Sequence, residues 1–202
     1  MISWYRNNKR DLPWRNTKDP YKIWLSEIIL QQTKIAQGLP YYNRFIKKYP
    51  NVQVLAGASE KEVLKLWEGL GYYSRARNLH KTAKIIVTNL EGIFPSTYKN
   101  LIKLPGIGDY TASAISSFSI NEINPVIDGN VYRFLSRLLG ILIPINTNKS
   151  LKEFRNIAKI LISKKNPSDF NQAIMEFGSL VCKPKNPICN ECIYQKSWFA
   201  YL

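Results

Sequence analysis

Two acidic residues, Glu27 and Asp128, stand in sequence surroundings that would give their side chains different acidities. Glu27 lies in the largely apolar stretch 24–30, where burial would disfavour the ionised form and suit a proton donor near neutral pH. Asp128 precedes Gly129 and an apolar helical repeat, and a helix N-terminus favours an ionised carboxylate. Cleavage of a glycosidic bond uses such a pair, one acid to protonate the leaving group and one carboxylate to stabilise an oxocarbenium-like sugar. Local sequence alone favours plainer roles, with Glu27 on the polar face of a helix and Asp128 as an N-cap.

A glycine-containing segment, Leu104–Thr111, could bind a phosphate group. Gly106 and Gly108 stand between a short helix expected near 96–103 and a helix of small residues expected over 112–118. Glycine permits positive φ and close backbone approach, and the free N–H groups at the start of a helix attract an anion. The same residues would also suit a plain turn between two helices, so the segment by itself leaves both interpretations open.

Three cysteines, Cys182, Cys189 and Cys192, are crowded near the end of the sequence with C-x6-C-x2-C spacing. Their odd number and their crowding favour metal or iron–sulfur chemistry in a reducing compartment over a disulfide framework.

The elements that must position these residues are helices. Asp19 followed by Pro20, and Ser59 followed by Glu62, are typical of helix starts, while Gly140 is placed to end a helix. Apolar residues recur at helical spacing in six stretches: 21–29, 63–67, 79–90, 131–139, 151–162 and 170–177. We find no two-residue alternation typical of strands, so the sequence predicts an all-α protein.

Length and charge indicate how many domains the protein has and what kind of partner it binds. The 202 residues suit one domain or two merged lobes. The excess of 29 basic over 14 acidic residues gives a net charge of +15, which favours a nucleic acid as partner. A general bias toward Ile, Lys and Asn would raise the charge without any binding function, so the motifs must decide. The sequence has no apolar run long enough to span a membrane and no secretory signal, which predicts a cytoplasmic protein.

Several long motifs, in the same order, resemble those of one enzyme family. Leu104–Ala112 is similar to the hairpin of the helix–hairpin–helix DNA glycosylases. Val126–Val131, downstream of it, belongs to the same superfamily resemblance. Within that superfamily, three segments resemble the adenine DNA glycosylases of the MutY type: Asp11–Arg15, Ser26–Thr33 and Trp67–Leu79. The resemblance extends from about Trp4 to about Cys192, nearly the whole chain.

The resemblance implies a two-lobed, all-α fold with the DNA cleft between the lobes. One lobe would comprise residues 17–127 with the hairpin, and the other residues 1–16 and 128–202, ending in a degenerate iron–sulfur loop. The family usually continues into a C-terminal domain that recognises 8-oxoguanine, and the sequence ends at Leu202 without it. The family also suggests a monomer. We expect the cytoplasmic protein to associate with the nucleoid because it binds DNA.

The resemblance places Glu27 and Asp128 on the family's catalytic positions. Glu27 would protonate the adenine and later activate a water molecule, while Asp128 would stabilise the sugar cation. Tyr110 occupies a position where endonuclease III-like enzymes have a lysine that attacks the sugar. Because tyrosine cannot form that Schiff base, it predicts a monofunctional glycosylase. Thymine-mismatch relatives also have tyrosine there but lack the acid at the position of Glu27.

The resemblance also assigns residues that would contact DNA. A glycosylase must extract its base from the duplex, which requires a wedge and a pocket. Gln32 and Tyr72 would enter the duplex, and Gly106 and Gly108 would bind the backbone. The adenine would be contacted by Trp14, Arg15, Leu30 and Gln172. Four basic residues along one helix would meet phosphates or form a solvated face: Arg75, Arg77, Lys81 and Lys84.

The cysteine loop departs from the family pattern. Cys182, Cys189 and Cys192 resemble the first three ligands of the family's [4Fe–4S] loop, but Trp198 occupies the position of the fourth. Such a cube takes four thiolates, and an indole cannot replace one. The sequence leaves open an incompletely ligated cluster (with Ser197 adjacent), a three-iron cluster, zinc, or loss of the cofactor.

Together these features predict a base-excision repair enzyme, a DNA N-glycosylase that acts on double-stranded DNA and removes adenine mispaired with guanine or 8-oxoguanine. One alternative is a non-catalytic remnant that binds mismatched DNA, suggested by the missing ligand and the missing domain. A second alternative is a glycosylase for thymine or oxidised pyrimidines.

Overall fold

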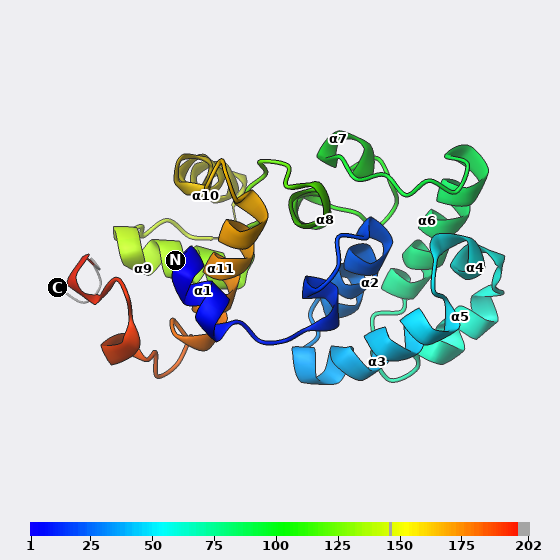
Figure 1. Cartoon of the computed structure of the whole chain (residues 1–202), viewed down its shortest axis with the longest axis horizontal. Coiled ribbons are helices and arrows are strands. Elements are labelled where there is room, and N and C mark those ends of the chain that lie inside the picture. The colour runs from blue at the N-terminus through cyan, green and yellow to red at the C-terminus, as the bar shows by residue number, and fades with distance from the viewer. Residues whose placement is uncertain (146, 198–202) are drawn as a thin grey trace. The chain divides into compact units, whose positions relative to one another are not determined.

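The computed structural model describes residues 1–145 and 147–197, and the regular secondary structure within those ranges is entirely helical (Figure 1). The predicted all-α class is thereby confirmed. The chain forms two compact units. We call Leu12–Ile120 the hairpin unit, and Met1–Asp11 with Asn121–Leu202 the terminal unit. The functional lobes expected from the sequence, 17–127 against 1–16 with 128–202, remain a prediction.

The hairpin unit is built around two helices that are buried over most of their length. Its helices are η1 (Pro13–Arg15), α2 (Pro20–Leu30), α3 (Ile35–Lys48), α4 (Val52–Gly57), α5 (Glu60–Trp67), α6 (Ser74–Asn89), α7 (Tyr98–Leu101) and α8 (Asp109–Ile120). α2 packs against α3, α6 and α8. The small alanine and serine residues of α8 are buried, which lets its backbone approach α2 closely. Eight of the eleven residues of α2 are buried, so this helix lies in the core of the unit.

The predicted helix starts are formed by the residues that the sequence indicated. The Asp19 carboxylate accepts a hydrogen bond from the Tyr21 backbone N–H at 2.9 Å, with Pro20 at the first helical position of α2. At the start of α5, Ser59 Oγ accepts from the Glu62 N–H at 3.3 Å and Glu62 Oε2 accepts from the Ser59 N–H at 2.9 Å. This is the expected capping box.

The terminal unit packs its helices around α11. Its elements are α1 (Ile2–Asn8), α9 (Gly129–Leu139), α10 (Asn148–Leu161), α11 (Pro167–Leu180), η2 (Cys189–Glu191) and η3 (Gln195–Ser197). α11 contacts α1 and α9, and Phe177 in its last turn meets Phe134 edge-on at a centroid distance of 5.4 Å. Gly140 ends α9 with a φ of 67°, in the left-handed conformation that its glycine predicted.

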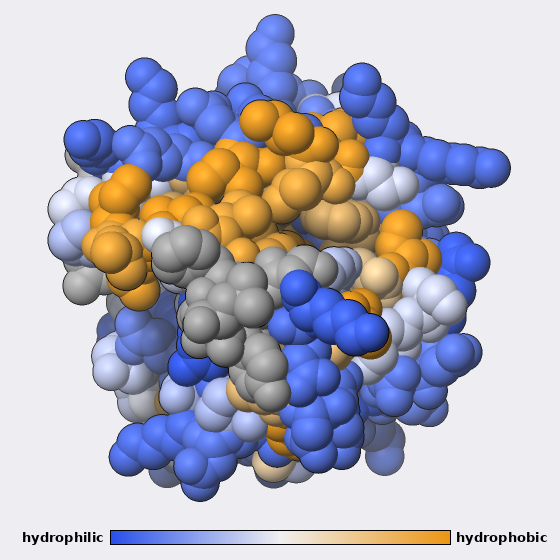
Figure 2. Space-filling view, turned by 90° about the vertical axis from the view of Figure 1, so that its left-hand side faces the viewer, coloured by the Kyte–Doolittle hydropathy of each residue, from blue (hydrophilic) through white to orange (hydrophobic). Residues whose placement is uncertain are grey.

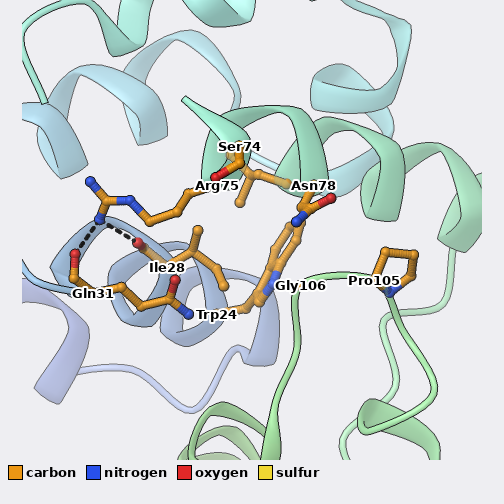
Figure 3. Close-up of a pocket in the computed structure, with 9 residues that line it drawn as sticks. Trp24, Ile28, Gln31, Ser74, Arg75, Asn78, Pro105 and Gly106 are labelled. Carbon is orange, nitrogen blue, oxygen red and sulfur yellow. Dashed lines mark hydrogen bonds between the residues drawn. The ribbon is translucent and has the colours of Figure 1, made fainter. Parts of the chain in front are cut away.

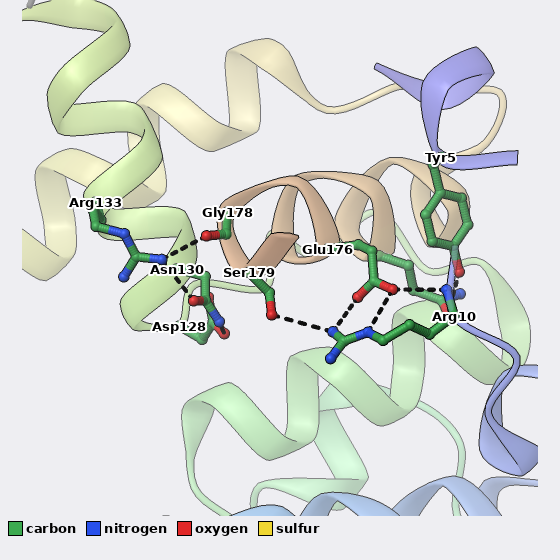
Figure 4. A network of polar contacts seen from close by, with 9 residues as sticks. Tyr5, Arg10, Asp128, Asn130, Arg133, Glu176, Gly178 and Ser179 are labelled. Carbon is green, nitrogen blue, oxygen red and sulfur yellow. Dashed lines mark hydrogen bonds and ion pairs between the residues drawn. The ribbon is translucent and has the colours of Figure 1, made fainter. Parts of the chain in front are cut away.

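A buried ion pair fastens the N-terminal segment to α11 (Figure 4). The carboxylate of Glu176, which is only 1% exposed, accepts from both the backbone N–H and the Nε of Arg10 at 2.9 Å. Arg10 Nη2 also donates to Glu176 Oε2 and to Ser179 Oγ. Because the fork of the guanidinium matches the carboxylate, the buried charge on Glu176 is compensated.

Apolar side chains gather on the face shown in Figure 2, and Leu142 and Ile160 of the terminal unit are among the most exposed of the large apolar residues. Among the residues that the structure describes, no helix is long and apolar enough to cross a membrane.

Gly178 sets the separation of α9 and α11, and we predict that its replacement by alanine destabilises the terminal unit. A Cβ atom at this position would lie 2.7 Å from the backbone oxygen of Asn130. Gly178→Ala should therefore lower the free energy of unfolding by about 1–3 kcal/mol, measured by urea denaturation.

Gly129→Ala is the matched control, since a Cβ at Gly129 would meet no atom within 4 Å. This variant should change the stability by no more than about 0.5 kcal/mol. Equal stability of the two variants would contradict the close approach of the helices.

Candidate active site

The α2 helix carries Glu27 into the interior of the hairpin unit. Glu27 is 7% exposed, and its neighbours Ser26 and Ile28 are buried as well. The plainer explanation, a residue on the polar face of an amphipathic helix, is therefore wrong. A carboxyl group that is held away from water is placed as a proton donor requires.

Trp14 and Arg15 lie in η1, before the buried helix that holds Glu27, and Leu30 is the last residue of that helix. Trp14 is buried in η1, which packs against α2, and its ring meets Tyr42 of α3 edge-on at 5.1 Å. Arg15 and Leu30 are half-buried. The structure thus brings these three predicted pocket residues and Glu27 into the same unit, with the aromatic contact fixing the position of Trp14.

The hairpin between α7 and α8 contains two glycines that differ in backbone conformation and in the space around them. Gly106 has a φ of 73°, and a Cβ on it would lie 2.8 Å from the Cβ of Asn78, so both conformation and space require glycine. Gly108 has no such φ, and a Cβ there would meet no atom within 4 Å. Because Gly108 is exposed directly before the first residue of α8, a phosphate could approach its backbone.

Tyr110 lies in the first turn of α8 and is half-buried. The α8 helix packs against α2, and the two are linked where Gln31 Nε2 donates to Thr111 Oγ1 at 3.4 Å. The hairpin, Tyr110 and the helix of Glu27 therefore form one continuous assembly within the hairpin unit.

Gln32 and Tyr72, the predicted wedge residues, share an unusual backbone conformation. Both are exposed, Tyr72 at 64%, and both have positive φ, 54° for Gln32 and 47° for Tyr72. Residues other than glycine seldom adopt this conformation, and it persists only where the surroundings impose it.

Arg75 corrects one expectation. The sequence groups it with basic residues that would face phosphates or solvent, but its side chain is buried and donates to the backbone carbonyls of Ile28 and Gln31 (Figure 3). The other three residues, Arg77, Lys81 and Lys84, are exposed. Burial also lowers the pKa of the Arg75 guanidinium. A side chain held in this way cannot also reach a phosphate.

Asp128 lies in the terminal unit, at the N-cap of α9 (Figure 4). Its Oδ1 accepts from the Val131 N–H at 2.8 Å, and its Oδ2 accepts from Asn130 Nδ2 at 2.7 Å. Arg133 Nη2 in turn donates to Asn130 Oδ1 at 2.8 Å. The carboxylate is thereby held in one orientation.

The pKa of Asp128 differs from the expectation. The sequence predicts that the helix N-terminus decides it, by favouring the ionised carboxylate. Burial, the largest cause, raises its pKa above the ordinary value of 3.8, although the hydrogen bonds from Val131 and Asn130 and the charge of Arg133 lower it. The helix N-terminus acts in the expected direction, and burial outweighs it.

The side-chain amide of Gln172 in α11 forms hydrogen bonds to other residues of the terminal unit. Tyr5 Oη donates to Gln172 Oε1 at 3.0 Å, and Gln172 Nε2 donates to Ser168 Oγ at 3.1 Å. Because an amide oxygen can accept two hydrogen bonds and an amide nitrogen can donate two, these contacts leave the amide able to bind the edge of a base as well.

The three cysteines line one small apolar space with Val181, Pro187 and Ile188. Cys182 and Cys192 are buried, and burial raises the pKa of the Cys192 thiol. Trp198 lies outside the described residues. Within the part of the chain that the structure describes, no three His, Cys, Asp or Glu side chains are placed to hold a metal ion. The described residues thus do not fit a four-thiolate cube.

The structure places the predicted residues in two groups. The hairpin unit holds Glu27 and Tyr110 with the residues for the pocket, the wedge and the backbone, while the terminal unit holds Asp128, Gln172 and the cysteines. Sequence reasoning missed the structural role of Arg75, although a signal existed. Arg75, Leu79 and Ile86 share the helical spacing of the buried stripe of α6, so the pattern itself places an arginine in the core.

Comparison with solved structures agrees with this fold. The structure of a thermostable thymine-DNA glycosylase superposes with a TM-score of 0.91 at 28% identity, covering 99% of this chain and 92% of that one. A structure of an endonuclease III–DNA complex, 21% identical over 98% of this chain and 92% of that one, has a TM-score of 0.83 and shows the shared fold alone.

The sequences of several adenine DNA glycosylases are similar to this chain over its full length. The enzyme of Buchnera aphidicola subsp. Schizaphis graminum is 42% identical over 202 residues, which are 58% of that relative. The mouse enzyme is 43% identical over 210 residues, 41% of its length. The chain thus spans about half the length of these relatives.

A family model described as the HhH-GPD superfamily base excision DNA repair protein matches residues 25–164, a range that includes the hairpin, Glu27 and Asp128. Because this match covers most of the chain, the chain belongs to the HhH-GPD superfamily of base excision DNA repair proteins.

Proposed function

We propose that this chain is the catalytic part of a monofunctional adenine DNA glycosylase, which removes adenine mispaired with guanine or 8-oxoguanine. The observation that carries the proposal is Glu27, a carboxyl group buried in α2 beside a helix–hairpin–helix element. The identity of 42% to an adenine DNA glycosylase supports the same substrate.

The hairpin would bind the DNA backbone. The exposed Gly108 leaves its N–H accessible ahead of α8, so a phosphate can approach without meeting a side chain. The net charge of +15 would add a salt-sensitive attraction that does not depend on sequence. Gln32 and Tyr72, exposed beside this region of the unit, would fill the stack while the adenine enters a pocket near Trp14, Arg15 and Leu30.

The proposed reaction breaks the bond between adenine and the sugar. Glu27 gives its proton to the adenine ring, at N7, so that the base leaves as a neutral species and the sugar carries the positive charge. Asp128 stabilises that charge as a carboxylate, and Glu27, now ionised, accepts a proton from the water that attacks the sugar. The reaction requires both carboxyl groups to reach the same nucleotide. Its products are free adenine and an intact strand with an abasic site.

Tyr110 supports a reaction that stops at the abasic site. A lysine at this position could attack the sugar carbon and form a Schiff base that leads to strand cleavage, whereas a phenol cannot. Tyr110 would position the sugar or shield the cation, and the DNA strand would stay intact.

Two other functions can be separated from this one by substrate. A binding remnant would retain duplex DNA without releasing a base. A thymine-DNA glycosylase, like the thermostable enzyme of similar structure, would release thymine from a mismatch. A panel of duplexes with mispaired adenine, mispaired thymine or thymine glycol distinguishes all three.

We predict that Glu27→Gln and Asp128→Asn each lower single-turnover adenine release from a mismatched duplex by about 10²- to 10⁴-fold, because each removes a group that acts in the transition state. Gel-shift affinity for the duplex should change little. Asparagine caps a helix as well as aspartate does, so a purely structural N-cap role predicts normal release by Asp128→Asn. Near-normal release by either variant would contradict the assignment.

We predict that activity falls on acidification at a pH above the ordinary carboxyl range, since Asp128 must be ionised and burial raises its pKa. Asn130→Ala removes a hydrogen bond that lowers this pKa, so the acidic limb of the pH–rate profile should move to still higher pH.

Ser179→Ala is the control for the pH profile. Its hydroxyl belongs to the Arg10–Glu176 network and makes no contact with Asp128, so the acidic limb should stay in place. A limb that does not move in Asn130→Ala, or that moves to lower pH, would contradict the role of Asp128.

The family's iron–sulfur cluster stays outside the mechanism, because the described residues offer three thiols that do not form a metal-holding group. We predict that anaerobically purified protein contains less iron and sulfide than a complete four-iron cube requires and still releases adenine. A full complement of iron and sulfide, with the visible spectrum of a cube, would contradict this.

A further inference from the structure

The buried side chain of Arg75 joins two loops that are distant in sequence. One of its two terminal nitrogens, Nη1, contacts the end of α2. Arg75 Nη1 lies within hydrogen-bond distance of the carbonyl oxygens of Ile28 at 3.1 Å and Ile29 at 2.9 Å, and it also donates to the carbonyl of Gln31. The last carbonyls of a helix have no partner within the helix, and a cation there is favoured by the helix dipole. Arg75 therefore caps α2 and holds the chain directly before Gln32.

The other terminal nitrogen of Arg75, Nη2, contacts the loop between α5 and α6. Arg75 Nη2 donates to the carbonyl of Leu70 at 3.4 Å and to that of Gly71 at 3.3 Å. The guanidinium carbon lies 5.7 Å from the centroid of the Tyr72 ring and 5.1 Å from that of Trp67. These contacts surround the residue that directly precedes Tyr72 and place the cation beside the tyrosine ring.

The two residues that follow these anchor points both have a positive φ. Gln32 comes after the Gln31 carbonyl and has a φ of 54°, while Tyr72 comes after the Gly71 carbonyl and has a φ of 47°. A residue other than glycine seldom adopts this conformation and needs neighbours that impose it. One side chain, Arg75, supplies a neighbour to both.

We propose that Arg75 is a positioning residue that fixes the spacing and orientation of Gln32 and Tyr72, so that the two side chains enter the duplex together. This rests on the proposed function, since it assigns a cause to the wedge of that reaction. Arg75 itself touches neither the base nor the backbone of DNA. Its planar guanidinium reaches both loops at once, which the single ammonium of a lysine cannot do.

The test compares two substrates that differ in their need for a wedge. In Arg75→Lys, single-turnover release of adenine from a paired A:G duplex should fall by about 100-fold, the scale of loss for a misplaced group. Release of adenine placed opposite an abasic site, where stacking and pairing are already weakened, should fall by no more than a few-fold. Fluorescence of 2-aminopurine at the target position should report less base extrusion in the paired duplex.

Two further variants separate positioning from general damage. Arg137→Lys is matched to Arg75→Lys, because Arg137 also donates to backbone carbonyls, those of Lys183 and Pro184, but lies in the terminal unit. It should leave both rates within a few-fold of the unsubstituted protein. If Arg75→Lys does not fold, Thr33→Val removes the Thr33 hydroxyl, which lies 3.3 Å from Arg75 Nη1 and itself donates to the Gln31 carbonyl at 3.3 Å. Because it loosens the same anchor point before Gln32, it should show the same selective loss in smaller measure.

The outcomes distinguish the two proposals. Equal losses on both substrates, or no loss on the paired duplex, would overturn the positioning role of Arg75 while leaving the glycosylase intact. If the unsubstituted protein releases adenine from neither substrate, the proposed function itself fails. Glu27→Gln should be inactive on both substrates, because protonation of the base is needed wherever the base begins.

Discussion

The burial of α2 on every side is the constraint on which the hairpin unit depends. Near its end Ile28 and Ile29 are buried, so their carbonyl groups, which lie in the last turn of the helix, need donors from the protein. Arg75 supplies those donors from α6. The same packing encloses Glu27. One packing arrangement therefore buries an acid and requires a buried cation near the end of the same helix.

The terminal unit controls its carboxylate by a different means. Asp128 is fixed by capping α9, so its structural and proposed catalytic roles use the same two oxygens. The cap orients the carboxylate, Arg133 holds the Asn130 amide that donates to it, and the charge of Arg133 also lowers the pKa of Asp128. Burial opposes these effects and prevails, which raises the pKa. A carboxylate that is partly desolvated in this way interacts more strongly with a developing cation than one in bulk water does.

The sequence predicted the features that depend on neighbouring residues and failed where distant residues decide. The caps at Asp19 and Ser59 and the stop at Gly140 are local, and all three form as expected. The net acidity of Asp128 depends on how deeply the tertiary structure buries it, which no local pattern gives. The position of Arg75 was open to prediction from the spacing of α6, but the presumption that arginine is exposed concealed it.

The distribution of backbone strain supports a connection between stability and the proposed wedge. Five described residues other than glycine have positive φ, and two of them, Asn121 and Asn186, are of the type that tolerates it best. Tyrosine and glutamine have no such tolerance, so Gln32 and Tyr72 are held there at a cost that packing must offset. Both are exposed, so the strain does not serve to bury either side chain. In the proposed wedge, the buried Arg75 holds both loops while the polar side chain of Gln32 and the aromatic side chain of Tyr72 stay exposed. Residues that are fixed in position before they insert between bases are expected to have this arrangement.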